Sequence, residues 1–522
     1  MKRVMIYLGI VALSTLIFLT RAGSGSSSSY ASPPRMVVLL VVDQLQETQL
    51  SSLAPNFRHG FARLLNQGAV FTNAHHDHAY TVTAAGHATI ATGTHPSHHG
   101  IVGNAWWDPH TRKWIGCVTD PEHNIVGKPD AKGRSPHFLQ RSTLGDWLKQ
   151  AYPDAKVMSV SIKDRGSILP AGYHPDGAYW FDYKTGEFVT STYYRKDYPA
   201  WVTEFNHRRL PDTYADSQWA PISSDFSGKP PWREDASPYE SDGIHTTFPH
   251  AFGDAPGNRH PEFYSEFACS PFGDQYTLAF ARRMIEAEAL GADETPDLLC
   301  ISLSATDKIG HRYGPYSREM YDHLLRLDRY LGEFLDFLDR RIGAGNYLVV
   351  LSSDHGALPV PEELQKRGVD ARRVPVEVLQ KAIDSVAAEV TAKLHLPEKP
   401  FLKIVNNGLA VVLSSQAEQA VPRSRVLKAL AEALRELPLI EDTFTPEELL
   451  SGDTPPRPFL EAFRHSYFPQ RSPNILVRLK AHVLIVWDRI ATSHGSPYAY
   501  DTHVPLIFSG PGISPDRHEQ RV

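Results

Sequence analysis

Short uninterrupted apolar runs recur along the chain and alternate with longer amphipathic segments. The apolar runs predict buried β-strands and cover residues 36–42, 156–160, 298–303, 347–352 and 504–508. Helices are predicted over residues 142–151, 274–289 and 317–341, the last with leucines and aromatic residues every three or four positions. Strands that are apolar throughout are buried on both faces, and helices between them cover those faces. The pattern therefore predicts an α/β fold, with a doubly wound, mostly parallel sheet and helices on both faces.

Two long segments interrupt this alternation. Residues 182–261 are rich in Pro, Gly, Tyr and Trp, and we expect an irregular insertion there. Residues 374–494 have helices of their own and a strand at 408–413, which predicts an inserted cap subdomain. The main domain is then expected to comprise residues 36–373 and 495–522.

The N-terminus has the features of a targeting segment. Lys2 and Arg3 precede the uncharged run 4–20, and a serine-rich stretch follows. A basic start, an apolar middle and small residues are typical of a secretory signal. The apolar run is also just long enough to span a bilayer, so an uncleaved anchor is the alternative. We therefore interpret residues 1–31 as a signal peptide or N-terminal anchor with a serine-rich linker, and expect an exported protein, periplasmic or extracellular, that contacts a membrane only if this segment is retained.

Composition limits the classes of partner and of redox chemistry. The formal net charge is −6, whereas nucleic-acid-binding domains are basic, so no nucleic-acid partner is expected. The three cysteines, Cys117, Cys269 and Cys300, allow at most one disulfide and have no metal-type spacing. Cys300 lies in a predicted strand, where we expect it to be a small hydrophobic core residue. Cysteine chemistry is therefore not predicted.

Two pairs of acidic and histidine residues have spacings that suit metal ions. Asp354 and His355 follow the predicted strand 347–352, at the end where open α/β sheets bind ligands. Asp307 and His311 are four residues apart, which places both side chains on one face of a helix. The two pairs together predict a centre for two metal ions.

A hydroxyl residue in a small-residue context lies in the segment 80–104. Thr83 is followed by Ala84, Ala85 and Gly86. Small side chains let a bulky group approach, and a helix N-terminus favours an anion. Thr81 is the rival hydroxyl two residues earlier, and the small residues after Thr83 favour Thr83. A threonine hydroxyl needs a base or a metal ion to become a good nucleophile, and the acidic and histidine pairs would supply the metal.

These motifs resemble those of the alkaline phosphatase superfamily, in the type I phosphodiesterase and nucleotide pyrophosphatase branch. Within it the chain is most similar to the threonine-nucleophile alkaline phosphatases. The matching positions, in the family's order, are Asp43 after the first strand, Thr83, Asp307 with His311, Asp354 with His355, and His503 in Thr502-His503-Val504-Pro505. The resemblance implies two Zn²⁺ ions, one held by Asp43, Thr83, Asp354 and His355, the other by Asp307, His311 and His503. It also implies Thr83 as the nucleophile that forms a phosphothreonine. Family members usually continue past the position of Val522, and that stretch carries none of the implied ligands.

A second resemblance concerns the phosphate group. Lys163-Asp164-Arg165, with the residues up to Gly172, is similar to the segment by which the monoesterase subgroup grips phosphate, and Asn104 matches the amide that also donates to it. A solvated surface pair is the alternative interpretation of Lys163 and Arg165. The resemblance implies an exported zinc phosphatase acting on small-molecule phosphate monoesters. A phosphodiesterase or nucleotide pyrophosphatase on the same scaffold is the main alternative, and a non-catalytic metal- or phosphate-binding protein is the third.

The remaining histidines of this part of the chain match no ligand position of the family. We expect them to be surface or loop residues: His75, His76, His78, His95, His98 and His99. His87, inside the nucleophile motif, is expected to pack against or cap the turn.

Overall fold

The computed structural model describes residues 33–223, 232–240, 246–253 and 262–522. The predicted signal peptide or anchor, residues 1–31, lies outside the described residues. No helix within these ranges is long and apolar enough to cross a bilayer. All three cysteines are buried, and none is in a disulfide.

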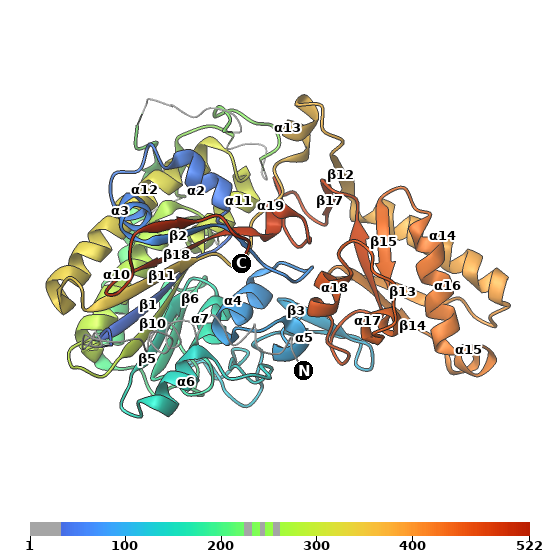
Figure 1. Ribbon diagram of the computed structural model, residues 1–522, viewed down its shortest axis with the longest axis horizontal. Coiled ribbons are helices and arrows are strands. Elements are labelled where there is room, and N and C mark those ends of the chain that lie inside the picture. Colours follow the sequence, from blue (N-terminus) through green and yellow to red (C-terminus); the bar gives the residue numbers. More distant parts are fainter. Residues whose placement is uncertain (1–32, 224–231, 241–245, 254–261) are drawn as a thin grey trace, which may run out of the picture.

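The main domain is built on a large central sheet (Figure 1). Within the described residues nine strands form it, in the order β19 (Asp516–His518), β2 (Ala69–His75), β18 (His503–Ser509), β11 (Tyr347–Ser352), β1 (Met36–Val42), β10 (Asp297–Leu303), β5 (Val157–Ser161), β6 (Gly177–Asp182) and β7 (Glu187–Val189). The strands from β11 to β6 run parallel, while β18 and β7 pair antiparallel with their neighbours. The predicted mostly parallel α/β sheet is confirmed.

Alternate residues of β1 are buried on opposite faces of this sheet. Val38 and Leu40 belong to a core that includes side chains of α3 (Gly60–Gln67), α10 (Pro271–Glu288) and α12 (Arg318–Leu338). Leu39 and Val41 belong to a core on the other face. That core is completed by residues of α4 (Thr83–Thr92) and α6 (Leu144–Ala151), and α7 (Asp164–Ala171) packs against α4 and β5. Burial on both faces explains why these strands are apolar throughout.

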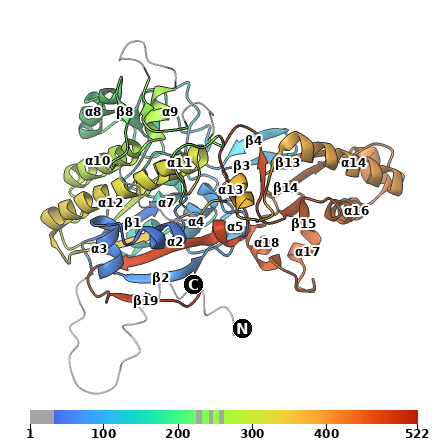
Figure 2. The same ribbon diagram turned by 90° about the horizontal axis from the view of Figure 1, so that it is seen from above.

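Residues 372–486 form a second unit, which has its own four-stranded sheet and its own core. β13 (Phe401–Val405), β14 (Gly408–Val412), β16 (Ile475–Leu479) and β15 (Ile440–Phe444) make an antiparallel sheet in that order. Apolar side chains of α14 (Val376–Leu394) and α16 (Arg423–Arg435) cover it. Both ribbon views place this unit at one end of the molecule, beside the central sheet (Figures 1 and 2). Its role as a cap stays a prediction.

Hydrogen bonds join this second unit to the segment that follows Asp77. Ser466 of α18 (Leu460–Ser466) accepts a bond of 2.7 Å from Ala79 N, and Asn406 Nδ2 donates to Ala105 O at 3.0 Å. Arg471 adds a bond of 2.6 Å to Gly100 O. The second unit is therefore fixed to the loops on either side of α4, the helix that begins with Thr83.

The segment expected to be an irregular insertion, residues 182–261, is partly regular where it is described. It contains β7, α8 (Ala200–His207) and the short pair β8 (Gln218–Trp219) and β9 (His250–Ala251). Several of its described aromatic residues are buried in the main core; Trp219, for example, is 1% exposed. The abundance of Trp and Tyr in this segment therefore reflects packing against the sheet domain.

Parallel pairing brings three strand ends together at one edge of the sheet. β1 lies between β10 and β11, with Val42 opposite Leu303 and Val41 opposite Ser352. The residues that follow these strands are therefore neighbours in space although they are far apart in sequence.

Candidate active site

Two groups of acidic and histidine side chains lie at this edge of the sheet. Within each group the potential ligand atoms are all within 4.8 Å of one another. One group consists of Asp43, Asp354 and His355, and the other of Asp307, His311 and His494. Oxygen and nitrogen donors without a thiolate are the set expected of a catalytic zinc site.

The first group is fully buried and comes from the ends of adjacent strands. Asp43 follows β1 and Asp354 follows β11. Gln44 N donates to Asp354 Oδ1 over 3.1 Å, which ties the two strand ends together. His355 Nδ1 lies 2.9 Å from Gly356 O, and its Nε2 faces Asp43 Oδ1 at 3.6 Å and Asp354 Oδ2 at 3.4 Å. Because Nδ1 donates to a carbonyl, Nε2 carries the lone pair that can bind a metal ion.

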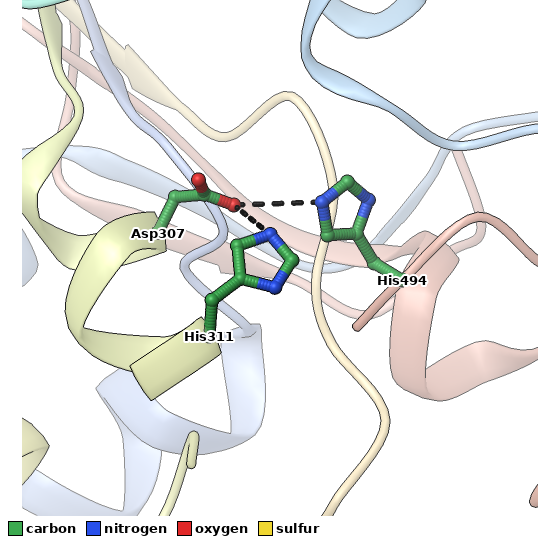
Figure 3. Close-up of side chains that lie close together, drawn as sticks. All are labelled: Asp307, His311 and His494. Carbon is green, nitrogen blue, oxygen red and sulfur yellow. Dashed lines mark ion pairs between the residues drawn. The ribbon is translucent and has the colours of Figure 1, made fainter. Parts of the chain in front are cut away.

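The second group combines a helix with a distant loop (Figure 3). Asp307 and His311 lie one turn apart on α11 (Ala305–Tyr313), with His311 Nε2 3.2 Å from Asp307 Oδ1. His494 Nε2 is 3.5 Å from the same oxygen. The two histidines direct Nδ1 to backbone carbonyls, His311 to Thr492 O at 2.9 Å and His494 to Thr81 O at 2.8 Å. His355 also directs Nδ1 to a backbone carbonyl. With Nδ1 engaged in this way, the Nε2 atoms of His311 and His494 point toward Asp307.

The structure does not bring His503 to either group. Its Nε2 lies 2.8 Å from Thr72 O, and its ring stacks on His75 at 4.5 Å. His503 begins β18 at the correct edge of the sheet, but it is paired with His75 of β2 and faces that strand. The place expected for His503 is taken by His494, so the predicted ligand set is corrected at this position.

Thr83 is the first residue of α4 and is almost completely buried. Its Oγ1 accepts a hydrogen bond of 3.1 Å from Lys163 Nζ. The rival Thr81 uses its hydroxyl to donate to Ser496 O at 2.9 Å, a bond that holds the loop after His494. A Cβ at Gly86 would come within 2.2 Å of Asp354 O. The small residue there lets the helix of Thr83 pack directly on the backbone of Asp354.

Lys163 lies between the two groups. Its ammonium is 2.7 Å from Asp43 Oδ2 and 2.6 Å from Asp307 Oδ2, and the side chain is 6% exposed. Burial lowers the pKa of Lys163, but the carboxylates of Asp307 and Asp43 outweigh it, and the pKa is raised. A solvated surface position, the alternative considered from sequence, does not fit this residue.

Arg165 and Asn104 lie near the same point. Arg165 is in the first turn of α7, and its buried Nε has no hydrogen-bond partner among the described residues. Asn104 Oδ1 accepts from Ala84 N at 2.9 Å, next to Thr83. With its oxygen used in this way, the NH₂ group of Asn104 is the part of the amide that can donate to another acceptor.

The carboxylates of the first group differ in their protonation equilibria. Burial, followed by the charge of Asp354, raises the pKa of Asp43 to about 7. Burial also raises the pKa of Asp354, but the neighbouring His355 and His87 outweigh it and leave the pKa low. Asp43 Oδ1 and His355 Nε2 have no hydrogen-bond partner within the described part of the chain. Buried acceptors that face one another without donors fit a bound divalent cation.

Two further residues support the groups and were not predicted to do so. Gln44 has a φ of 71° and reaches both groups, since its Nε2 donates to Asp307 Oδ1 over 2.8 Å. His87 was expected only to pack or cap a turn. Its Nδ1 lies 3.1 Å from Asp354 Oδ2, and the charge of Asp354 raises the pKa of His87 despite the opposing effect of burial. The only sequence signals were that Gln44 follows Asp43 and that His87 lies one turn after Thr83.

The other histidines of this region are less exposed than expected. His76, His78 and His99 are buried rather than on the surface. His76 Nε2, for example, lies 2.9 Å from Ser353 O. None of them belongs to either metal-type group found among the described residues.

Comparison with known proteins gives matches over nearly the whole chain. Residues 37–452 match the family model of type I phosphodiesterase / nucleotide pyrophosphatase. Alkaline phosphatase PhoV of Synechococcus elongatus is 34% identical over 93% of this chain and 86% of its own length. Alkaline phosphatase PafA of Elizabethkingia meningoseptica is 33% identical over 98% of this chain and 92% of its own.

A solved structure shows the same fold. The crystal structure of PafA superposes with a TM-score of 0.85 at 32% identity and covers 94% of this chain and 93% of that chain. The resemblance inferred from the motifs is thereby confirmed, and the chain belongs to the type I phosphodiesterase / nucleotide pyrophosphatase family.

Proposed function

We propose that the protein is an exported, zinc-dependent phosphatase that hydrolyses phosphate monoesters through a phosphothreonine at Thr83. The observation that carries the proposal is the position of Lys163, whose ammonium contacts Thr83 Oγ1 and also the carboxylates of both metal-type groups. A hydroxyl, a cation and two ligand groups thus meet at one point. Relatives that cover nearly the whole chain are named alkaline phosphatases, which supports monoesters as the substrate class.

The geometry supports two ligand sets. Asp43, Asp354 and His355, with Thr83, would hold one Zn²⁺ ion. Asp307, His311 and His494 would hold the other. When bound, such ions lower the pKa of a coordinated hydroxyl or water and offset charge on the attacking and leaving oxygens.

The reaction proceeds in two displacements. Thr83 gives up its hydroxyl proton and its Oγ1 bonds to phosphorus as the bond between phosphorus and the ester oxygen breaks. The ester oxygen takes up a proton and leaves as the alcohol. Water then attacks the phosphothreonine, which restores the Thr83 hydroxyl and releases inorganic phosphate. Burial of Thr83 at the start of α4 keeps the oxygen in one orientation for both steps.

The residues around Thr83 explain a preference for monoesters. A monoester presents a dianionic phosphoryl group, whereas a diester presents a monoanion with one oxygen already substituted. Lys163 is a point charge beside the attacking oxygen, and the guanidinium of Arg165 can hold two oxygens at once. The Asn104 amide and the backbone N–H groups at the start of α4 add uncharged donors. A diesterase on the same scaffold is the second candidate, because the matching family model includes phosphodiesterases.

The proposal includes two assignments outside the site. Residues 1–31 serve as a signal peptide or anchor, which places the enzyme in the periplasm or outside the cell. Residues 374–494 serve as a cap, and the bonds from Asn406 and Arg471 to the loops flanking α4 support this role. The partners are small phosphate esters.

The test is the double variant Lys163→Ala with Arg165→Ala, assayed as kcat/KM on an aryl monoester and on an aryl diester with zinc present. Loss of one charged hydrogen-bond partner in a desolvated site costs on the order of 2–4 kcal/mol, or roughly 30- to 1,000-fold in rate. We expect at least that loss on the monoester and far less on the diester. Exposed Lys132→Ala is the control, and it should leave both rates near those of the parent.

Two outcomes would contradict the proposal. Equal losses on both substrates would give the pair a structural role. Higher kcat/KM of the parent on the diester would favour the second candidate.

A further inference from the structure

A wide cleft leads outward from the proposed active site. Its volume is about 1140 Å³, and Lys163, Asp307 and His311 lie at its inner end. This is much more room than one phosphoryl group fills, so the outer part is available to the leaving group of a substrate. The charges on its walls therefore bear on which leaving groups fit.

Some cations of the cleft are neutralised by acidic neighbours. Arg134 Nε lies 2.7 Å from Asp164 Oδ2, and Lys128 pairs with Asp182. These pairs cancel much of each other's charge and offer little net attraction to an anion.

Lys308 is different. It lines the cleft directly after Asp307, and its ammonium lies 4.5 Å from the centre of the Tyr183 ring. The neighbouring Asp307 carboxylate pairs with Lys163 instead, and Lys308 has no ion pair among the described residues. A sheltered cation without an acidic partner is stabilised when an anion binds beside it.

Helix α11 presents two pairs of side chains on two different sides. Asp307 and His311 are four residues apart on one side of the helix, and both belong to the second metal-type group. Lys308 and Arg312 are also four residues apart, which places them on a neighbouring side of the helix, about 100° round its axis. Arg312 lines the same cleft and keeps its charge at every physiological pH.

We propose that Lys308 and Arg312 form a second anion subsite, which favours phosphate monoesters whose leaving group carries another anionic group, such as a carboxylate or a second phosphate. The subsite rests on the proposed phosphatase function and specifies its substrate class. Because the pair is turned away from Asp307, it acts on the leaving group and not on the phosphoryl group that is transferred. Lys308 and Arg312 are therefore specificity-determining residues.

The experiment compares two esters that differ in one charge. They are 4-(carboxymethyl)phenyl phosphate and its amide, 4-(carbamoylmethyl)phenyl phosphate, whose methylene group keeps the phenol leaving groups similar. We expect the zinc-loaded parent to prefer the carboxylate by roughly 5- to 30-fold in kcat/KM, since two partly screened ion pairs contribute about 0.5–1 kcal/mol each. The preference should shrink as NaCl is added.

Three variants locate the effect. Lys308→Met and Arg312→Gln should each reduce the carboxylate-to-amide ratio, and the double variant should bring it near one. Lys184→Met removes an exposed cation from the mouth of the same cleft and should leave the ratio as in the parent. Because the ratio divides kcat/KM on the carboxylate by kcat/KM on the amide, any effect of a variant on the nearby Asp307 that slows both esters equally cancels.

The outcomes separate this proposal from the proposed function. A parent ratio near one, or a ratio unchanged in the double variant, would overturn the subsite while leaving the phosphatase intact. An equal fall in Lys184→Met would also overturn it, in favour of diffuse attraction by the whole cleft. If the parent hydrolyses neither ester, the proposed function fails, and calorimetric binding of the corresponding phosphonates, carboxylate against amide, still decides whether the subsite exists.

Discussion

Substitution of His494 gives the sharpest test of the ligand assignment, with His503 as its matched control. We expect His494→Ala to release the metal ion of the Asp307 group. Four-ligand zinc sites bind with about 10–16 kcal/mol, which is about 2.5–4 kcal/mol for each ligand. At about 1.4 kcal/mol per tenfold change, loss of one ligand weakens binding by roughly 60- to 700-fold. His494 also stacks on His355 with ring centres 3.6 Å apart, so the first group should weaken slightly as well.

The assay is zinc content per chain after dialysis against a zinc buffer, followed by kcat/KM on an aryl monoester across a zinc titration. His494→Ala should retain about one ion and recover activity only at high zinc. His503→Ala loses a bond to Thr72 O and a ring contact with His75, which costs about 1 kcal/mol of stability but no metal. Loss of an ion from His503→Ala together with full zinc in His494→Ala would refute the assignment.

The remaining predictions concern the nucleophile, the packing of its helix and a buried histidine. Thr83→Ala should abolish turnover with zinc retained, while Thr83→Ser keeps measurable activity and a phosphate that mass spectrometry finds on residue 83; normal turnover by Thr83→Ala would contradict this role. Gly86→Ala should destabilise the fold by about 1–3 kcal/mol in urea unfolding, because the added carbon meets backbone at 2.2 Å, whereas Gly452→Ala, with nothing within 4 Å, should not. Burial lowers the pKa of His99 to about 3, and its Nδ1 accepts from Ile101 N, so the folded state resists protonation. The stability that this neutral ring confers is complete above pH 6.5 and is lost as pH falls from 6.5 toward 3, by at most about 5 kcal/mol. The fall in unfolding free energy with decreasing pH should therefore be shallower in His99→Gln. An unchanged pH profile would show that His99 does not contribute to acid unfolding.

Much of the sheet could be predicted because its strands are apolar throughout. The runs at 36–42 and 347–352 coincide with β1 and β11, and the run at 298–303 differs from β10 by one residue. The strands β2 and β19, at one end of the sheet, were missed because both are partly exposed, and β2 carries polar residues such as Thr72 and Asn73. A strand buried on both faces is a continuous apolar run, which is easy to recognise in a sequence. A strand buried on one face has a weaker apolar pattern.

The two groups of acidic and histidine side chains were predictable where their members follow a strand or share a helix turn. Asp43 and Asp354 end predicted strands, and the spacing of Asp307 and His311 places them together whatever the rest of the chain does. His494 carried no such signal, because it lies in a loop that only tertiary packing brings beside Asp307. His503 had a more recognisable sequence context, yet strand pairing turned its ring toward His75.

The wide spacing of the proposed ligands along the chain would couple metal binding to folding. The first group joins Asp43 to residues 354 and 355, and the second joins α11 to His494 across the whole second sheet unit. An unfolded chain would have to close long loops to assemble either set, and closing them costs chain entropy. In the folded chain the loops are already closed, so metal binding does not carry this cost. At the proposed sites, bound zinc would therefore act as a reversible cross-link that stabilises the folded state by RT ln(1 + [Zn]/Kd) for each site. The melting temperature of such an enzyme would then report the free zinc concentration of its surroundings.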